Sequence, residues 1–186
     1  MKLQKDLGQK ITQYAKHYVL SKYDPTTLVM SFDPELEGWK LKHKGFYIGI
    51  VDSSGTQLVR VGFLEENCSN IVNSTNRVLE AVFAELTTKN ISVKAIQTST
   101  FYVTMVIDVV FMSNPLNWNE NDDGVYFSWG DRYKGMYLPY EIKRLSVKKT
   151  EIMNRVCSWE ASVPGNLWRL PEGLCSRLIC DSYFCN

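Results

Sequence analysis

The chain has 186 residues, of which 45% are hydrophobic and 22% are charged, with a formal net charge of +1. This composition is that of an ordinary globular protein with a packed core, and it excludes general disorder. The near-zero net charge excludes a strong general attraction to nucleic acid or anionic lipid, and no apolar run approaches the length that a bilayer span requires.

The N-terminal part of the chain predicts a helix, a short strand and a β-hairpin. Apolar residues recur every three or four positions over residues 3–22, as on one face of a helix. Alternating apolar residues at 28–32 indicate a short strand, and the polar segment 33–44 indicates a loop. Two β-rich runs, 46–51 and 57–63, are joined by a turn that ends in glycine, which is typical of a hairpin.

The middle of the chain predicts a second long helix and the central strand of a sheet. Residues 68–87 return to helical spacing, and residues 93–98 indicate a strand. The run TFYVTMVIDVVFM at 100–112 is dense in β-branched and aromatic residues and almost continuously apolar. We therefore expect it to be covered on both faces.

A polar loop and a second hairpin are predicted next. The stretch PLNWNENDD at 115–123 carries acidic and amide side chains between two strands, as a loop does. Residues 124–129 and 132–138 indicate two strands around a tight turn at Gly130 and Asp131.

The end of the chain predicts a helix and a final strand. Ser146 is a good N-cap for a helix over residues 147–160, and residues 174–184 indicate a strand. Together these elements predict a single α+β domain over residues 1–186, with a mixed or mostly antiparallel sheet and about three helices packed on it.

The stretch RYKGMYLPYEI at 132–142 is typical of a strand that leads into a helix. Tyr133, Gly135 and Tyr137 share one face of the strand, and the glycine allows a neighbouring group, such as a packed aromatic ring, to approach the backbone closely. Pro139 suits the first position of a short helix, and Glu141 suits its first turn.

Cysteine and histidine usage predicts neither disulfides nor a metal site. Five cysteines without a secretion signal indicate reduced thiols and a cytoplasmic protein. Cys175, Cys180 and Cys185 are spaced so that neither a strand nor a helix converges three thiolates, and neither histidine belongs to a metal-ligating motif. Cys68, near the expected start of a helix, is the best-placed nucleophile, but no catalytic motif surrounds it. We expect no metal, no cofactor and no catalytic residue.

From residue 124 onward the chain resembles a known family. The strand Gly124–Trp129 is followed by Tyr133-Lys134-Gly135-Met136-Tyr137-Leu138-Pro139, then by a helix and a last strand. This order is similar to the C-terminal half of the AMMECR domain family, the A component of the AmmeMemoRadiSam gene clusters. The resemblance implies an α+β fold and, from the gene neighbourhood, a link to a radical-based modification.

The family signature L-R-G-C-I-G is absent from this chain. If Gly55 and Gly62 match the glycines that bound it, Leu58 stands in the place of the arginine and Arg60 in that of the cysteine. The resemblance therefore carries no catalytic residue over to this chain.

The sequence suggests two functions from different classes, and a third function that is less favoured. The first is a non-catalytic binding or interaction protein for an unknown small molecule or protein, with a cleft beside Arg60 and the segment 132–142. The second is an enzyme acting on a small molecule or nucleotide through Arg60, Glu65, Asp131 and Glu141. The tentative binding residues are Arg60, Glu65, Asp131, Tyr133, Tyr137 and Glu141.

The third function is a nucleic-acid-binding module, which is the least favoured of the three. Lys40, Lys42 and Lys44 alternate beside Trp39 and His43, and a basic segment with an aromatic residue can contact nucleic acid. Alternating lysines are more often a solvated edge, so we expect neither nucleic acid nor a membrane as the partner.

Overall fold

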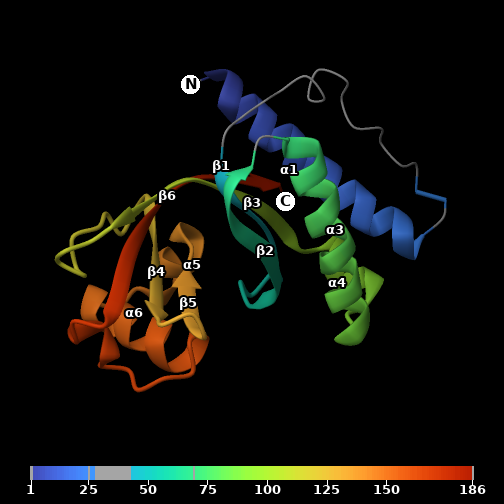
Figure 1. The fold of residues 1–186 in the computed structure, drawn as a ribbon. Helices are drawn as coiled ribbons and strands as arrows, with labels where there is room; N and C mark the ends of the chain where they lie inside the picture. The colour runs from blue at the N-terminus through green and yellow to red at the C-terminus, as the bar shows by residue number, and fades with distance from the viewer. Residues whose placement is uncertain (1, 25, 28–42, 69, 186) are drawn as a thin grey trace. The chain divides into compact units, whose positions relative to one another are not determined.

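The computed structural model describes residues 2–24, 26–27, 43–68 and 70–185, with the backbone alone for residues 2–4 and 65–68. The chain divides into two compact units: Met1–Met105 with Ser182–Asn186, and Val106–Asp181 (Figure 1). The strand expected at 28–32 and most of the loop expected at 33–44 lie outside the described residues. The single-domain organisation over residues 1–186 stays a prediction.

The strands form a six-stranded sheet in the order β2-β1-β3-β6-β4-β5, which confirms the α+β class (Figure 1). The pairs β1–β2, β4–β5 and β4–β6 are antiparallel. Strands β3 and β6 each contribute residues to both units. The bounds are β1 His43–Val51, β2 Gln57–Cys68, β3 Thr100–Phe111, β4 Asp123–Trp129, β5 Tyr133–Tyr137 and β6 Gly173–Cys185.

In the first unit, one long helix packs on the β1–β2 hairpin and a second long helix packs against the first, because each carries an apolar stripe. Helix α1 spans Lys2–Tyr23 and α3 spans Ile71–Thr88, as their periodicity predicted. The Asn70 side chain caps α3 by accepting from the N–H of Asn73 at 3.0 Å. The helix thus begins at Ile71, and Cys68 ends β2 rather than opening a helix.

The prediction of a strand at 93–98 is wrong, because this segment forms helix α4, Val93–Gln97. The Ser92 hydroxyl accepts from the backbone N–H of Ala95 at 3.2 Å and so caps a short helix. A segment of five residues is too short for its apolar pattern to distinguish a helix from a strand.

In the second unit, β4, β5 and β6 pack on a set of short helices. Helix α5 spans Pro139–Leu145 and α6 spans Lys149–Arg155; a π-helical turn, η1, follows at Val156–Glu160, and a 3₁₀ turn, η2, lies at Leu167–Arg169. The buried core contains Met112, Trp118, Val125, Phe127, Tyr137, Ile142, Ile152, Met153, Val156, Cys157, Ala161, Trp168 and Cys175.

The helix predicted over 147–160 with Ser146 as its N-cap is wrong in two details. Ser146 adopts the left-handed conformation, with φ of 48°, and ends α5 instead. Helix α6 begins at Lys149, and its last turn is π-helical, with the Ala161 N–H donating to the Val156 carbonyl oxygen at 2.9 Å. The described residues therefore contain five α-helices rather than about three.

Candidate functional site

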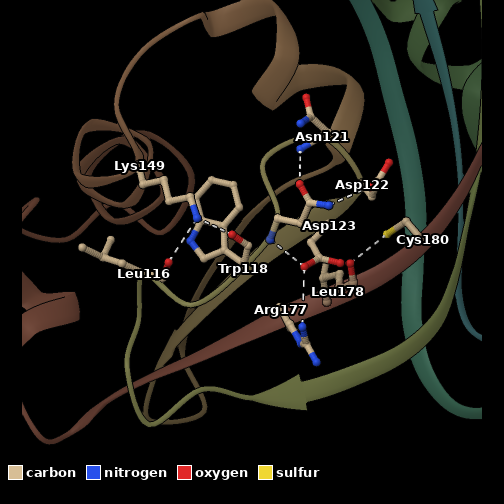
Figure 2. A network of polar contacts seen from close by, with 10 residues as sticks. Leu116, Trp118, Asn121, Asp122, Asp123, Lys149, Arg177, Leu178 and Cys180 are labelled. Carbon is tan, nitrogen blue, oxygen red and sulfur yellow. Dashed lines mark hydrogen bonds and ion pairs between the residues drawn. The ribbon is translucent and has the colours of Figure 1, made fainter.

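The loop between β3 and β4 builds a polar network in the second unit (Figure 2). Asp123, the first residue of β4, is buried, and its carboxylate accepts from the Asn119 backbone N–H at 2.8 Å. The Asn119 side chain donates to the Asp122 carboxylate at 2.7 Å and accepts from the Asn121 N–H at 3.0 Å. The acidic and amide residues therefore hold the loop in one conformation, as turn chemistry predicts.

Arg177 adds a weak charge contact to this network. Its Nη1 lies 3.9 Å from Asp123 Oδ2, and its side chain is 40% exposed. An exposed ion pair at this distance contributes at most about 1 kcal/mol. The backbone N–H of Asn119 is therefore the principal partner of the buried Asp123 carboxylate.

Lys149 joins the start of α6 to the same loop. Its ammonium donates to the backbone carbonyl oxygen of Leu116 at 3.3 Å and also to that of Trp118. Its Nζ lies 4.9 Å from the centroid of the Trp118 ring, and Figure 2 shows the lysine reaching that indole. In the part of the chain that the structure describes, no carboxylate pairs with Lys149.

The Trp118 indole N–H has no hydrogen-bond partner among the residues that the structure describes, although Trp118 is only 4% exposed. A buried donor without an acceptor is rare in folded proteins, because it loses its hydrogen bond to water and forms no protein hydrogen bond in exchange. Trp118 and Lys149 therefore place two incompletely used donors next to one another.

Three of the described thiols are poor nucleophiles because loss of solvation disfavours their thiolate forms. Burial raises the pKa of Cys157 to about 11, and it raises the pKa values of Cys175 and Cys180 to about 12. The Cys180 thiol also donates to the Leu178 carbonyl oxygen at 3.4 Å (Figure 2). At neutral pH these three side chains are neutral thiols, which neither attack carbonyls nor ligate metals.

No group of His, Cys, Asp and Glu side chains among the described residues is arranged to hold a metal ion. No helix in the same part of the chain is both long enough and apolar enough to cross a membrane.

The residues predicted to line one cleft are divided between the two units. Arg60 and Glu65 lie on β2 in the first unit, whereas Asp131, Tyr133, Tyr137 and Glu141 lie in the second. Arg60 is half-buried and pairs across the strands with Gly49. The side chain of Glu65 lies outside the described residues.

Within the second unit, the predicted residues have different surroundings. Asp131 is exposed in the turn between β4 and β5. Tyr137 is 7% exposed and packs in the core, while Tyr133 is half-buried, with the Arg132 guanidinium 5.5 Å from its ring centroid. The Glu141 carboxylate accepts from the Leu138 N–H at 2.8 Å and so caps α5. Tyr137 and Glu141 therefore have structural roles.

Sequence reasoning missed both Trp118 and Lys149. A local signal existed for Trp118, because it is the one aromatic residue in the polar run PLNWNENDD. Lys149 has no such signal, because its contacts are with residues about 30 positions away.

A second surface feature is Trp159 on η1, whose side chain is 64% exposed. The Arg155 guanidinium lies 4.6 Å from the Trp159 ring centroid, and Arg155 Nε donates to Glu151 Oε1 at 2.9 Å. The three side chains form a ladder along α6 and η1 that holds the exposed indole in place.

Comparisons with known proteins establish the fold alone. No protein-family model matches the chain, and no curated protein sequence matches it. The chain is similar to the crystal structure of the uncharacterized protein PH0010 from Pyrococcus horikoshii. The two chains are 12% identical, with a TM-score of 0.77 over 97% of this chain and 92% of that chain. At this identity the likeness says that the two share a fold.

Proposed function

We propose that the protein is a non-catalytic binding protein that recognises a partner protein through the surface around Trp159. The observation that carries the proposal is the Glu151–Arg155–Trp159 ladder. It holds a large aromatic side chain in place while leaving it 64% exposed. Tryptophan and arginine are enriched among the residues that dominate binding energy at protein interfaces. A side chain that is already held loses little conformational freedom when a partner covers it.

The chemistry of the described thiols and carboxylates supports binding rather than catalysis. Cys157, Cys175 and Cys180 are neutral at pH 7, and Glu141 is used to cap a helix. The enzymatic alternative through Arg60, Glu65, Asp131 and Glu141 stays a prediction, because these residues are divided between two units. The nucleic-acid alternative depends mainly on Lys40 and Lys42, which lie outside the described residues.

The proposal keeps the AMMECR-like scaffold expected from residues 124–183. Loss of the L-R-G-C-I-G signature while the strand–helix pattern is retained fits a relative that has kept the scaffold for binding. This part of the proposal depends on the resemblance and not on the likeness to PH0010, an uncharacterized protein.

Site-specific photo-crosslinking in the native cell tests the proposal. A photoreactive amino acid replaces Trp159 in one variant and the exposed Asn166 of the same unit in the control. We expect a discrete covalent adduct from position 159 and none from position 166, with mass spectrometry identifying the partner. We also expect Trp159→Phe to retain part of the co-purified partner and Trp159→Ala to lose it. Identical adduct patterns from the two positions would rule out an interface at Trp159.

A further inference from the structure

In the second unit, a buried indole N–H lies beside a lysine that pairs with no carboxylate of the described residues. In the described part of the chain, no acceptor faces the buried indole N–H of Trp118. The Lys149 ammonium has three N–H groups, and it donates hydrogen bonds to the carbonyl oxygens of Leu116 and Trp118. Backbone carbonyls orient the ammonium, but they supply no negative charge.

The two donors belong to one location. Lys149 Nζ lies 4.9 Å from the centroid of the ring that carries the unpaired N–H, and Figure 2 shows the ammonium beside the indole. The nearby carboxylates are engaged elsewhere, Asp122 with the Asn119 side chain and Asp123 with the Asn119 backbone and Arg177. Among the described residues, the location therefore holds one positive charge without a carboxylate partner and one indole N–H without an acceptor.

We propose that Trp118 and Lys149 form a binding site for a carboxylate. One carboxylate oxygen accepts from the indole N–H of Trp118, and the other accepts from the Lys149 ammonium. A carboxylate matches the pair because it carries one negative charge and two acceptor oxygens. A water molecule could accept from the indole, but it would leave the lysine charge without a counterion. A phosphate dianion would carry more charge than the single cation offers.

Entry to this site is on the side of Lys149. The indole nitrogen has no exposed surface, whereas the lysine side chain is half-buried. Binding therefore requires the flexible lysine to exchange a backbone carbonyl for the incoming carboxylate. With two polar contacts and this rearrangement, we expect a dissociation constant on the order of 1 mM for a minimal ligand such as acetate.

The site goes beyond the proposed function, since it does not involve Trp159 or its ladder. Two sources could supply the carboxylate: a free small carboxylic acid, or an acidic group on a peptide. Acetate represents the free acid. Acetyl-diglycine with a free C-terminus represents the peptide carboxylate, and its C-terminal amide is the control. Tighter binding of the free-terminus peptide than of acetate assigns the site to a peptide carboxylate; the reverse order assigns it to a free acid.

NMR of the ¹⁵N-labelled full chain provides the test. The chain has five tryptophans, and the indole signal missing from Trp118→Phe is that of Trp118. We expect sodium acetate, but not sodium chloride at equal ionic strength, to shift this signal saturably in the millimolar range. Lys149→Met should weaken the effect at least tenfold, whereas Lys148→Met, at the exposed neighbouring position, should leave it unchanged.

Several results would overturn the site. They are no saturable shift with either carboxylate, an equal shift with chloride, or an undiminished shift in Lys149→Met. The four remaining indole signals report whether each variant is folded. If they collapse in Lys149→Met, Lys149→Gln replaces it, because the amide keeps a donor for the loop carbonyls without the charge. Loss of the Trp159 crosslink leaves this titration unaffected, so the two proposals fail separately.

Discussion

Gly135 on β5 lies directly against the carbonyl oxygen of Val156 in the π-helical turn. A β-carbon built on Gly135 would be 2.5 Å from that oxygen and 2.8 Å from the Ala161 nitrogen. The sequence predicted a close approach to this glycine by a group such as a packed aromatic ring, whereas the approaching group is the backbone of η1. The π-helical turn therefore packs on the strand without an intervening side chain.

Replacing this glycine should destabilise the second unit. Gly135→Ala forces η1 away from β5, and we expect a loss of about 1–3 kcal/mol in the free energy of unfolding, measured by urea denaturation. Gly130→Asn is the matched control, because position 130 has φ of 58° and no atom within 4 Å of an added β-carbon. Asparagine tolerates that conformation, so the control should lose about 1 kcal/mol or less. Equal losses would refute direct packing of η1 on Gly135.

The hydrogen bond between Glu141 and the Leu138 N–H predicts different effects for two substitutions. Glu141→Gln keeps an oxygen that can cap α5, so stability should change by only a few tenths of a kcal/mol. Glu141→Ala removes the acceptor and should cost about 1 kcal/mol, read from thermal unfolding. If Glu141→Gln abolished ligand binding or turnover while unfolding were unchanged, the carboxylate would have a chemical role beyond capping.

Asp123 should stabilise its loop mainly through the Asn119 backbone. Asp123→Ala leaves that N–H without its acceptor, and we expect a loss of about 1–3 kcal/mol, with faster hydrogen exchange at the Asn119 amide. Arg177→Gln removes only a half-exposed pair at 3.9 Å and should cost less than about 1 kcal/mol. A larger loss in Arg177→Gln than in Asp123→Ala would make the ion pair the principal contact.

The buried thiols predict a loss of stability at high pH. Burial raises the pKa of Cys175 from 9.0 to about 12, so the folded state holds this proton more tightly than the unfolded chain does. Its contribution is therefore fully present below pH 9 and is lost progressively as the pH rises towards 12. In urea titrations, Cys175→Ala should show a smaller fall in unfolding free energy over this range than the unsubstituted chain.

Alkylation checks the same thiols by a second route. Iodoacetamide at pH 8 should leave Cys157, Cys175 and Cys180 unmodified in the folded protein and modify all three in denaturant. Rapid modification of Cys180 in the folded state would contradict the burial that raises its pKa.

Local pattern was sufficient for the elements with long apolar periodicity. Helices α1 and α3 and strand β3 were predicted closely, because each repeats its apolar spacing over many residues. The β4–β5 hairpin and the start of α5 also followed from local chemistry, since Gly130 suits the turn and Pro139 suits the first helical position.

Short elements were predicted less well because few residues define them. Val93–Gln97 could be read as a strand, and only the Ser92 cap and the burial of Ile96 distinguish it as a helix. The boundary between α5 and α6 likewise depends on the left-handed conformation of Ser146, which its residue type does not predict.

The candidate sites depended on tertiary structure throughout. Composition and periodicity decided the fold class and the apolar faces, because burying apolar surface requires only the right spacing along the chain. Which polar residues meet was decided by packing. Lys149 lies beside Trp118 only because α6 packs against the loop before β4, and Trp159 lies exposed on the π-helical turn. Contacts between residues that are distant in the chain produce no periodic pattern in the sequence, so only the folded structure reveals them.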